Sequence, residues 1–186
     1  MDNKSVAIES LAADMRDEHA AIVQYLQHAY GLGETGEASE IEAIARDEMR
    51  HFDWLAEAIV ELGGDPDMER GTVDLAGAGP LDWMANDVLA EERAIAQYEE
   101  HIKAIDDPSV RRLLKRILSD ERAHRDQFSG LADELTAEGV ETTGPLEERS
   151  AEGFEPGDID ILQAGVRHEY SVILQYLYHN LSLIHI

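Results

Sequence analysis

Apolar residues recur along this chain at alternating steps of three and four, which is the spacing of one face of an α-helix. No stretch alternates between apolar and polar residues in the way that would support a sheet. The helical pattern holds in five segments, at residues 8–29, 41–62, 81–105, 110–135 and 159–176. We therefore predict an all-α chain.

The connections between these segments predict how the helices are arranged. Gly33 and Gly63 follow the first and second segments, where glycine commonly ends a helix. Residues 63–80 are rich in Gly, Asp and Pro and read as a long connection, whereas Asp-Asp-Pro at 106–108 makes a short break. Short, long and short connections favour an up-down-down-up four-helix bundle with one crossover, in which the second and third helices run parallel.

The fifth segment repeats the first. Residues 18–28 and 169–179 share Glu, Gln, Tyr, Leu and His at identical offsets. We therefore expect a four-helix domain over residues 1–139, a linker over 140–157, and an extra C-terminal helix over 158–186. Our interpretation of that extra helix is the first helix of a second, truncated copy of the domain.

Composition excludes several classes of function. Hydrophobic residues make up 44% of the chain, enough to bury a core, and cysteine is absent, which excludes disulfides and Cys-type zinc sites. No apolar run could span a membrane and no signal core begins the chain, so the cytoplasm is the expected location. A net charge of −25 argues against nucleic acid as a partner. The acidic surface fits either a salty cytoplasm or the guidance of cations, and charge alone does not separate these.

Acids and histidines interrupt the middle of the first four apolar stripes. Burying a carboxylate without compensation costs roughly several kcal/mol, so four at one level require a partner. Two divalent cations would balance four carboxylates, and two imidazoles would bind as neutral donors. An oxygen and nitrogen ligand set without sulfur suits iron or manganese better than structural zinc. The alternative is that these residues form surface salt bridges and that the stripes are wrongly phased. The interrupting residues are Glu18, Glu48, His51, Glu91, Glu121 and His124.

These motifs resemble the ferritin-like di-iron superfamily, in which a Glu from each of two helices and Glu-x-x-His from each of two others hold the metals. Within it the chain looks most like bacterioferritin, at residues 18–29, 47–51, 87–91 and 117–124. The resemblance implies two iron ions, or manganese, with Glu48 and Glu121 as bridging carboxylates. It also implies that Fe(II) is oxidised by dioxygen or peroxide, in iron storage or detoxification, by a homo-oligomer of at least two chains.

Three further residues acquire expectations from the resemblance. Tyr25 could pass an electron to the centre, in a catalytic role; the alternative is a core tyrosine whose hydroxyl bonds a ligand carboxylate. His28 lies off the main stripe and is expected to face solvent in part. Met49 stands where bacterioferritins place a methionine that ligates haem between two subunits, although a methionine beside a core stripe more often packs in the core.

Two alternative functions remain open at this point. One is a peroxide-consuming di-metal oxidoreductase, similar to rubrerythrin or manganese catalase, although the chain lacks the cysteines of the rubrerythrin iron domain. The other is a metal-free interaction bundle with the same fold. The short first connection, and a linker in place of a short fifth helix, argue against the hollow shell typical of bacterioferritin.

Overall fold

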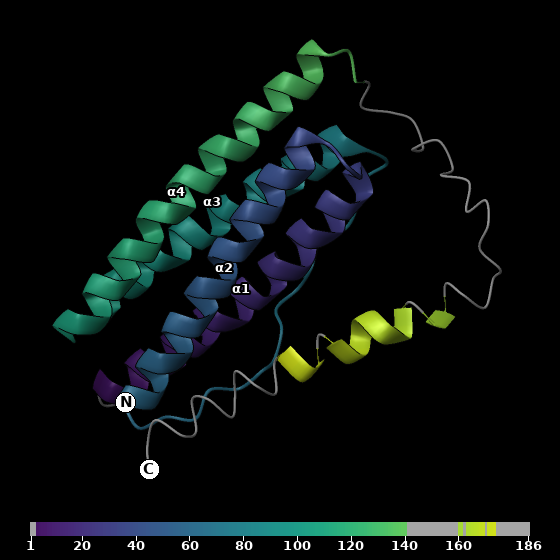
Figure 1. Ribbon diagram of the computed structural model, residues 1–186. Coiled ribbons are helices and arrows are strands. Elements are labelled where there is room, and N and C mark those ends of the chain that lie inside the picture. The colour runs from purple at the N-terminus through teal and green to yellow at the C-terminus, as the bar shows by residue number, and fades with distance from the viewer. Residues whose placement is uncertain (1–2, 141–159, 162, 170, 174–186) are drawn as a thin grey trace. The chain divides into compact units, whose positions relative to one another are not determined.

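Four long helices form the body of the protein, and the described part of the chain contains no strand. The all-α prediction is therefore confirmed. The computed structural model (Figure 1) describes residues 3–140, 160–161, 163–169 and 171–173. The helices are α1 (Asn3–Leu32), α2 (Gly36–Glu61), α3 (Pro80–Ala104) and α4 (Pro108–Ala137).

Local sequence sets the helix ends close to where they were predicted. Thr35 caps α2 by accepting a hydrogen bond from the Ala38 amide at 3.1 Å. Asp107 caps α4 in the same way, with Pro108 following in the first turn. Gly63 adopts a positive φ of 71° after α2, a conformation that glycine reaches without steric cost.

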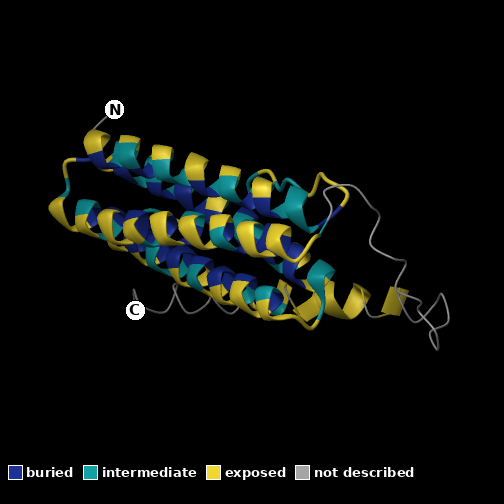
Figure 2. Ribbon diagram, turned by 90° about the horizontal axis from the view of Figure 1, so that it is seen from above, coloured by how far each residue is buried: buried dark blue, intermediate teal, exposed yellow. Residues whose placement is uncertain are grey.

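The helices pair as two hairpins. α1 packs most extensively on α2 and α3 on α4, and α1 also lies against α3. The long connection between α2 and α3 is the single crossover of the predicted up-down-down-up bundle, and that fold class is confirmed. Figure 2 shows buried residues along the inner sides of the helices and exposed residues along the outer sides.

The crossover is fixed to α1 by backbone contacts. The Gly71 amide donates to the Arg16 carbonyl at 2.8 Å, and the Asp74 amide donates to Oε1 of Gln24 at 2.8 Å. A Cβ at Gly71 would lie 3.1 Å from the Arg16 carbonyl oxygen, which is tighter than most Cβ contacts, so a glycine suits this close approach. The crossover therefore runs along α1 between Arg16 and Gln24, the part that carries Glu18.

The described residues between 160 and 173 are helical, as expected for an extra C-terminal helix. They belong to a unit separate from the four-helix bundle. The domain limits at 139 and 157 and the truncated second copy stay predictions, since most of that region lies outside the described residues. None of the described helices is long and apolar enough to cross a membrane.

Candidate metal centre

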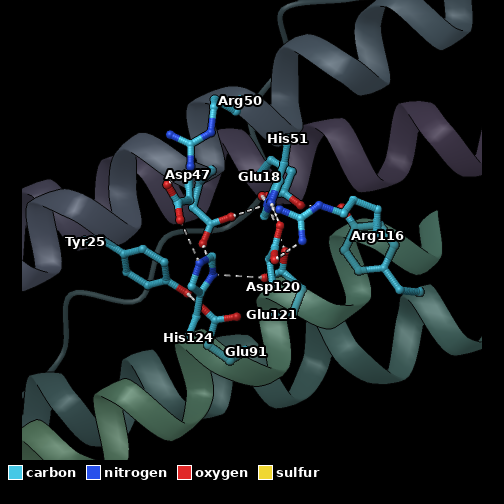
Figure 3. A network of polar contacts seen from close by, with 12 residues as sticks. Glu18, Tyr25, Asp47, Arg50, His51, Glu91, Arg116, Asp120, Glu121 and His124 are labelled. Carbon is cyan, nitrogen blue, oxygen red and sulfur yellow. Dashed lines mark hydrogen bonds and ion pairs between the residues drawn. The ribbon is translucent and has the colours of Figure 1, made fainter. Parts of the chain in front are cut away.

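All six residues predicted as metal ligands come together in the middle of the bundle (Figure 3). Each is buried, with no more than 4% of its surface exposed. The helical spacing explains this, because residues three apart share a face and each Glu-x-x-His pair therefore points inward together. The set is Glu18 on α1, Glu48 and His51 on α2, Glu91 on α3, and Glu121 and His124 on α4.

The six side chains form two overlapping groups of four. Glu18 and His51 belong to one group, and Glu91 and His124 to the other. Both groups include Glu48 and Glu121. In each group one ligand atom from every residue lies within 4.8 Å of the others. Two cations could therefore share the two common carboxylates, each with one further carboxylate and one imidazole.

Both histidines direct the same ring nitrogen at the carboxylates. Nδ1 of His51 lies 2.8 Å from an oxygen of Glu48 and 2.9 Å from one of Glu121. Nδ1 of His124 lies 2.9 Å from the other oxygen of Glu48. Glu48 therefore lies between the two histidine rings, with one carboxylate oxygen near each ring.

Hydrogen bonds among the described residues leave part of this cluster unsatisfied. Four buried atoms have no hydrogen-bond partner, namely Glu48 Oε1, Glu91 Oε2, Glu121 Oε1 and His124 Nδ1. Some approach one another within 3 Å but without the angles of a hydrogen bond. Orphaned buried acceptors cost about 1–3 kcal/mol each, which divalent cations would offset. Oxygen and imidazole donors that converge in this way fit iron or manganese.

The protein's own groups shift the acidity of the glutamates strongly. Burial raises the pKa of Glu18 and of Glu91 well above the ordinary range, and repulsion from neighbouring carboxylates raises both further. Burial would also raise the pKa of Glu48, but the two histidines outweigh it and hold that pKa well below its usual range. Glu48 is therefore the carboxylate that stays ionised most readily.

The pKa values of both histidines are raised, whereas burial alone lowers the pKa of an imidazole. Burial lowers their pKa values, but the surrounding carboxylates outweigh that effect and raise the pKa of His51 well above its ordinary value. The same competition, dominated by Glu121 and Glu48, raises the pKa of His124 to about 10. Protons and metal ions therefore compete for the same atoms, because a histidine ligand must be neutral.

Two buried tyrosines bind ligand carboxylates from the opposite helix. The Tyr25 hydroxyl on α1 donates to Oε1 of Glu91 on α3 at 2.6 Å. The Tyr98 hydroxyl on α3 donates to Oε1 of Glu18 on α1. Burial raises both phenol pKa values well above normal, so both hydroxyls keep their protons and act as donors. Tyr98 appeared in the sequence only as a core position, although each tyrosine follows its helix's glutamate by seven residues.

Two aspartates behind the histidines were not identified from the sequence. Asp120 lies 3.5 Å from Nε2 of His51, and Asp47 lies 3.5 Å from Nε2 of His124 (Figure 3). Carboxylates in this position commonly orient a metal-binding imidazole. In the sequence, an Asp directly precedes the Glu of both Glu-x-x-His motifs. That repeat could have pointed to these aspartates, but their role depends on which helix lies opposite, which the sequence does not give.

Comparison with known proteins places this geometry in a family. Residues 8–137 match the family described as a ferritin-like domain. The chain belongs to the ferritin family. The matched range covers all four helices of the bundle almost completely, and it contains all six residues of the candidate centre.

Bacterioferritins are among the ferritin-family members that the chain resembles. The bacterioferritin of Desulfovibrio desulfuricans is 33% identical over 141 residues, covering 72% of this chain and 78% of that protein. The bacterioferritin of Rhodobacter capsulatus is 29% identical over 134 residues, covering 68% and 82%. A crystal structure of the Desulfovibrio desulfuricans protein, described as showing its di-iron site in different catalytic states, matches with a TM-score of 0.69 at 28% identity. That match covers 83% of this chain and 97% of the other. The predicted resemblance is confirmed.

The expectation for His28 was wrong. The side chain is only 2% exposed, and its Nδ1 lies 2.9 Å from both oxygens of Asp87. Gln24 donates to the same aspartate at 2.8 Å, and the His28 ring stacks on Trp83 with the planes 5° apart. Burial was predicted from the positions of apolar side chains alone. That rule fails here because this part of the α1–α3 interface is made of polar side chains.

Met49 does not pack in the core, contrary to the simpler alternative. Its side chain is 40% exposed on α2. An exposed methionine is available to a group bound from outside the bundle, but the sequence favoured packing over haem ligation at this position, and haem ligation stays untested.

Proposed function

We propose that this chain is a di-iron ferritin-family oxidoreductase that oxidises Fe(II) with dioxygen or peroxide, in iron storage or detoxification. One observation carries the proposal: two buried ligand groups that share Glu48 and Glu121. A structural role for a single cation would need only one of these groups. The family membership and the likeness to a di-iron bacterioferritin support the same function.

The protein residues have distinct roles in this proposal. Glu48 and Glu121 would each contact both metals, because both belong to both groups. Glu18 with His51, and Glu91 with His124, would complete the two sites. When bound, the two irons supply the electrons that reduce the oxidant, and their closeness lets both engage one small molecule.

The surroundings of the centre hold its ligands in place. Tyr25 and Tyr98 fix one oxygen each of Glu91 and Glu18, which leaves the remaining carboxylate oxygens for metal. Phe128 packs against Tyr25 with ring centroids 4.8 Å apart. A rigid shell of this kind preserves the ligand geometry as the charge of the metals changes.

We further infer a homo-oligomer of at least two chains in the cytoplasm. The likeness to bacterioferritin supports this inference. Light scattering coupled to size exclusion would measure the assembly directly. A mass of one chain at micromolar concentration would contradict this part of the proposal and leave the di-iron centre unaffected.

The test of the main proposal is a titration of metal-free protein with Fe(II), first without oxygen and then with dioxygen or hydrogen peroxide. We expect rapid ferric absorbance that saturates at about two irons per chain in the fast phase. Slow uptake beyond that, with the protein still soluble, would indicate storage. A faster response to peroxide than to dioxygen would identify the oxidant.

The chain provides a matched control for the ligand assignment. Glu91 is 1% exposed and its neighbour Glu92 is exposed. Glu91→Gln should abolish the fast phase, whereas Glu92→Gln should match the parent protein. Equal loss in both variants, or a melting temperature indifferent to Fe(II), Mn(II) and Zn(II), would favour the metal-free bundle instead.

A further inference from the structure

A cavity between α1 and α3 leads toward the candidate centre from the side covered by the crossover. Its volume is ≈ 240 Å³. Its lining includes Glu18, Glu91 and Glu121 of the centre, as well as Asp14 and Asp17 from the preceding turn of α1. The cavity therefore joins the ligand cluster to acids that have no part in the predicted ligand set.

Asp14 is buried in a way that the bundle alone does not explain. The residue is 1% exposed, yet its Oδ2 atom has no hydrogen-bond partner among the described residues. Its other oxygen accepts from Nε2 of Gln97 at 2.9 Å and lies 2.8 Å from Nδ1 of His101. The two partners thus hold one oxygen of this cavity-lining residue and leave the second, buried oxygen without a partner.

Asp17 brings a second carboxylate to the same place. The Nε2 atom of Gln97 also donates to an oxygen of Asp17 at 2.9 Å, so one amide bridges both aspartates. Asp17 is exposed, whereas Asp14 is buried. The crossover passes close to Asp17, since a Cβ added at Gly71 would lie 2.6 Å from one of its oxygens. The pair spans the path from solvent to the bundle interior.

We propose that Asp14 and Asp17 form a third divalent-cation site, separate from the dinuclear centre, at which Fe(II) binds on its way through the α1–α3 cavity to Glu18. The route rests on the proposed Fe(II)-oxidising function, but the site itself is testable without it. Carboxylate oxygens are the preferred ligands of hard divalent cations, and water would complete the coordination.

Gln97 and His101 would act as positioning residues for this site. The amide of Gln97 can present either its nitrogen or its oxygen, because its two orientations have nearly the same shape. In the present orientation the amide nitrogen donates a hydrogen bond to both aspartates. Rotated by half a turn, the amide would present its oxygen as a third ligand. His101 would keep its hydrogen bond to Oδ1 of Asp14 while Oδ2 contacts the cation, because carboxylates that bind metal are commonly held by such partners.

The charges around the cavity favour a cation. Five acids are among its lining residues, and Arg93 is its only basic lining residue. Arg93 is exposed, so its charge is screened by solvent. Burial raises the pKa of Asp14, which is the cost of a desolvated carboxylate that a bound cation would offset.

Counting Mn(II) ions bound to the metal-free full-length protein would test the site. Mn(II) favours oxygen ligands, does not require oxidation, and its unbound fraction is measured by electron paramagnetic resonance. We expect three Mn(II) per chain in the parent protein and two in the Asp14→Asn, Asp17→Asn double variant. The matched control is Asp126→Asn, Asp133→Asn, which removes the same charge from exposed positions on α4 and should still bind three.

Two further variants keep the result decisive. Asp17→Asn alone changes only an exposed residue, so it should fold normally and raise the Kd for the third Mn(II) at least tenfold. Glu18→Ala, Glu121→Ala should lose the dinuclear centre and keep the third ion. Two ions in the parent, or a third ion that persists in the Asp14→Asn, Asp17→Asn variant, would overturn the proposed site. Unchanged binding in the Glu18→Ala, Glu121→Ala variant would instead count against the proposed function.

Discussion

The Tyr25 hydroxyl on α1 donates a hydrogen bond of 2.6 Å to Glu91 on α3, and the Tyr98 hydroxyl on α3 donates one to Glu18 on α1. Each tyrosine thus fixes a carboxylate of the neighbouring helix. The exchange ties α1 to α3, which are far apart in sequence, at the level of the candidate centre. Because the two tyrosine–glutamate pairs are similar, the Tyr98 pair serves as an internal control for a catalytic role of Tyr25.

Substitution of the two tyrosines by phenylalanine should separate a structural from a catalytic role. Tyr25→Phe and Tyr98→Phe each remove one donor from a buried carboxylate, so each should destabilise the protein by about 1–3 kcal/mol. If Tyr25 passes an electron, only Tyr25→Phe should slow Fe(II) oxidation at unchanged metal stoichiometry. Stopped-flow absorbance and a search for a tyrosyl radical by electron paramagnetic resonance would measure this. Equal oxidation rates in both variants would rule out the special role of Tyr25.

The aspartates behind the histidines should contribute to metal affinity. Asp120→Asn removes the charge that faces Nε2 of His51, and Asp47→Asn does the same for His124. Loss of such a partner typically weakens metal binding by about 10–100-fold. Calorimetric titration with Mn(II) would measure the change. Asp126→Asn, on an exposed position of the same helix as Asp120, should have no effect, and an equal loss there would attribute the change to general surface charge.

Metal binding should release protons. The pKa values of Glu18, Glu91 and His51 are raised in the protein alone, and that of His124 is raised to about 10, so each group holds its proton to a higher pH than usual. Metal needs their unprotonated forms, so affinity should fall as the pH falls and rise toward pH 10. Calorimetry at pH 7 in buffers of different ionisation enthalpy would count the protons. Binding enthalpies that do not depend on the buffer would contradict these shifts.

The sequence predicted the parts of this protein that depend on helical periodicity. A spacing of three or four residues puts side chains on one face wherever the helix lies, so Glu48 and His51 could be assigned together. The meeting of six such residues followed from four stripes interrupted at one level. The crossover contacts of Gly71 and Asp74 were not predictable in this way, because they depend on how a loop lies against α1.

The same limit explains the error at His28. A polar side chain off the apolar stripe is usually exposed, but here Asp87 on α3 faces it, and the pair buries together. Nothing in the local sequence around His28 specifies a partner 59 residues away. Asp47 and Asp120 were missed for a related reason, since each serves a histidine on the opposite helix.

The pair of His28 and Asp87 should support the stability of the bundle and leave metal stoichiometry unchanged. His28→Ala leaves the buried Asp87 carboxylate without its contact to the imidazole, which typically costs about 1–3 kcal/mol. Asp87→Asn removes the charge and keeps an oxygen that can still accept from Gln24, so its cost should be smaller. Urea unfolding would give the free energies, and Mn(II) counting on the folded variants would test the centre. A larger loss in Asp87→Asn than in His28→Ala would show that the carboxylate charge of Asp87 matters more to stability than its contact with His28.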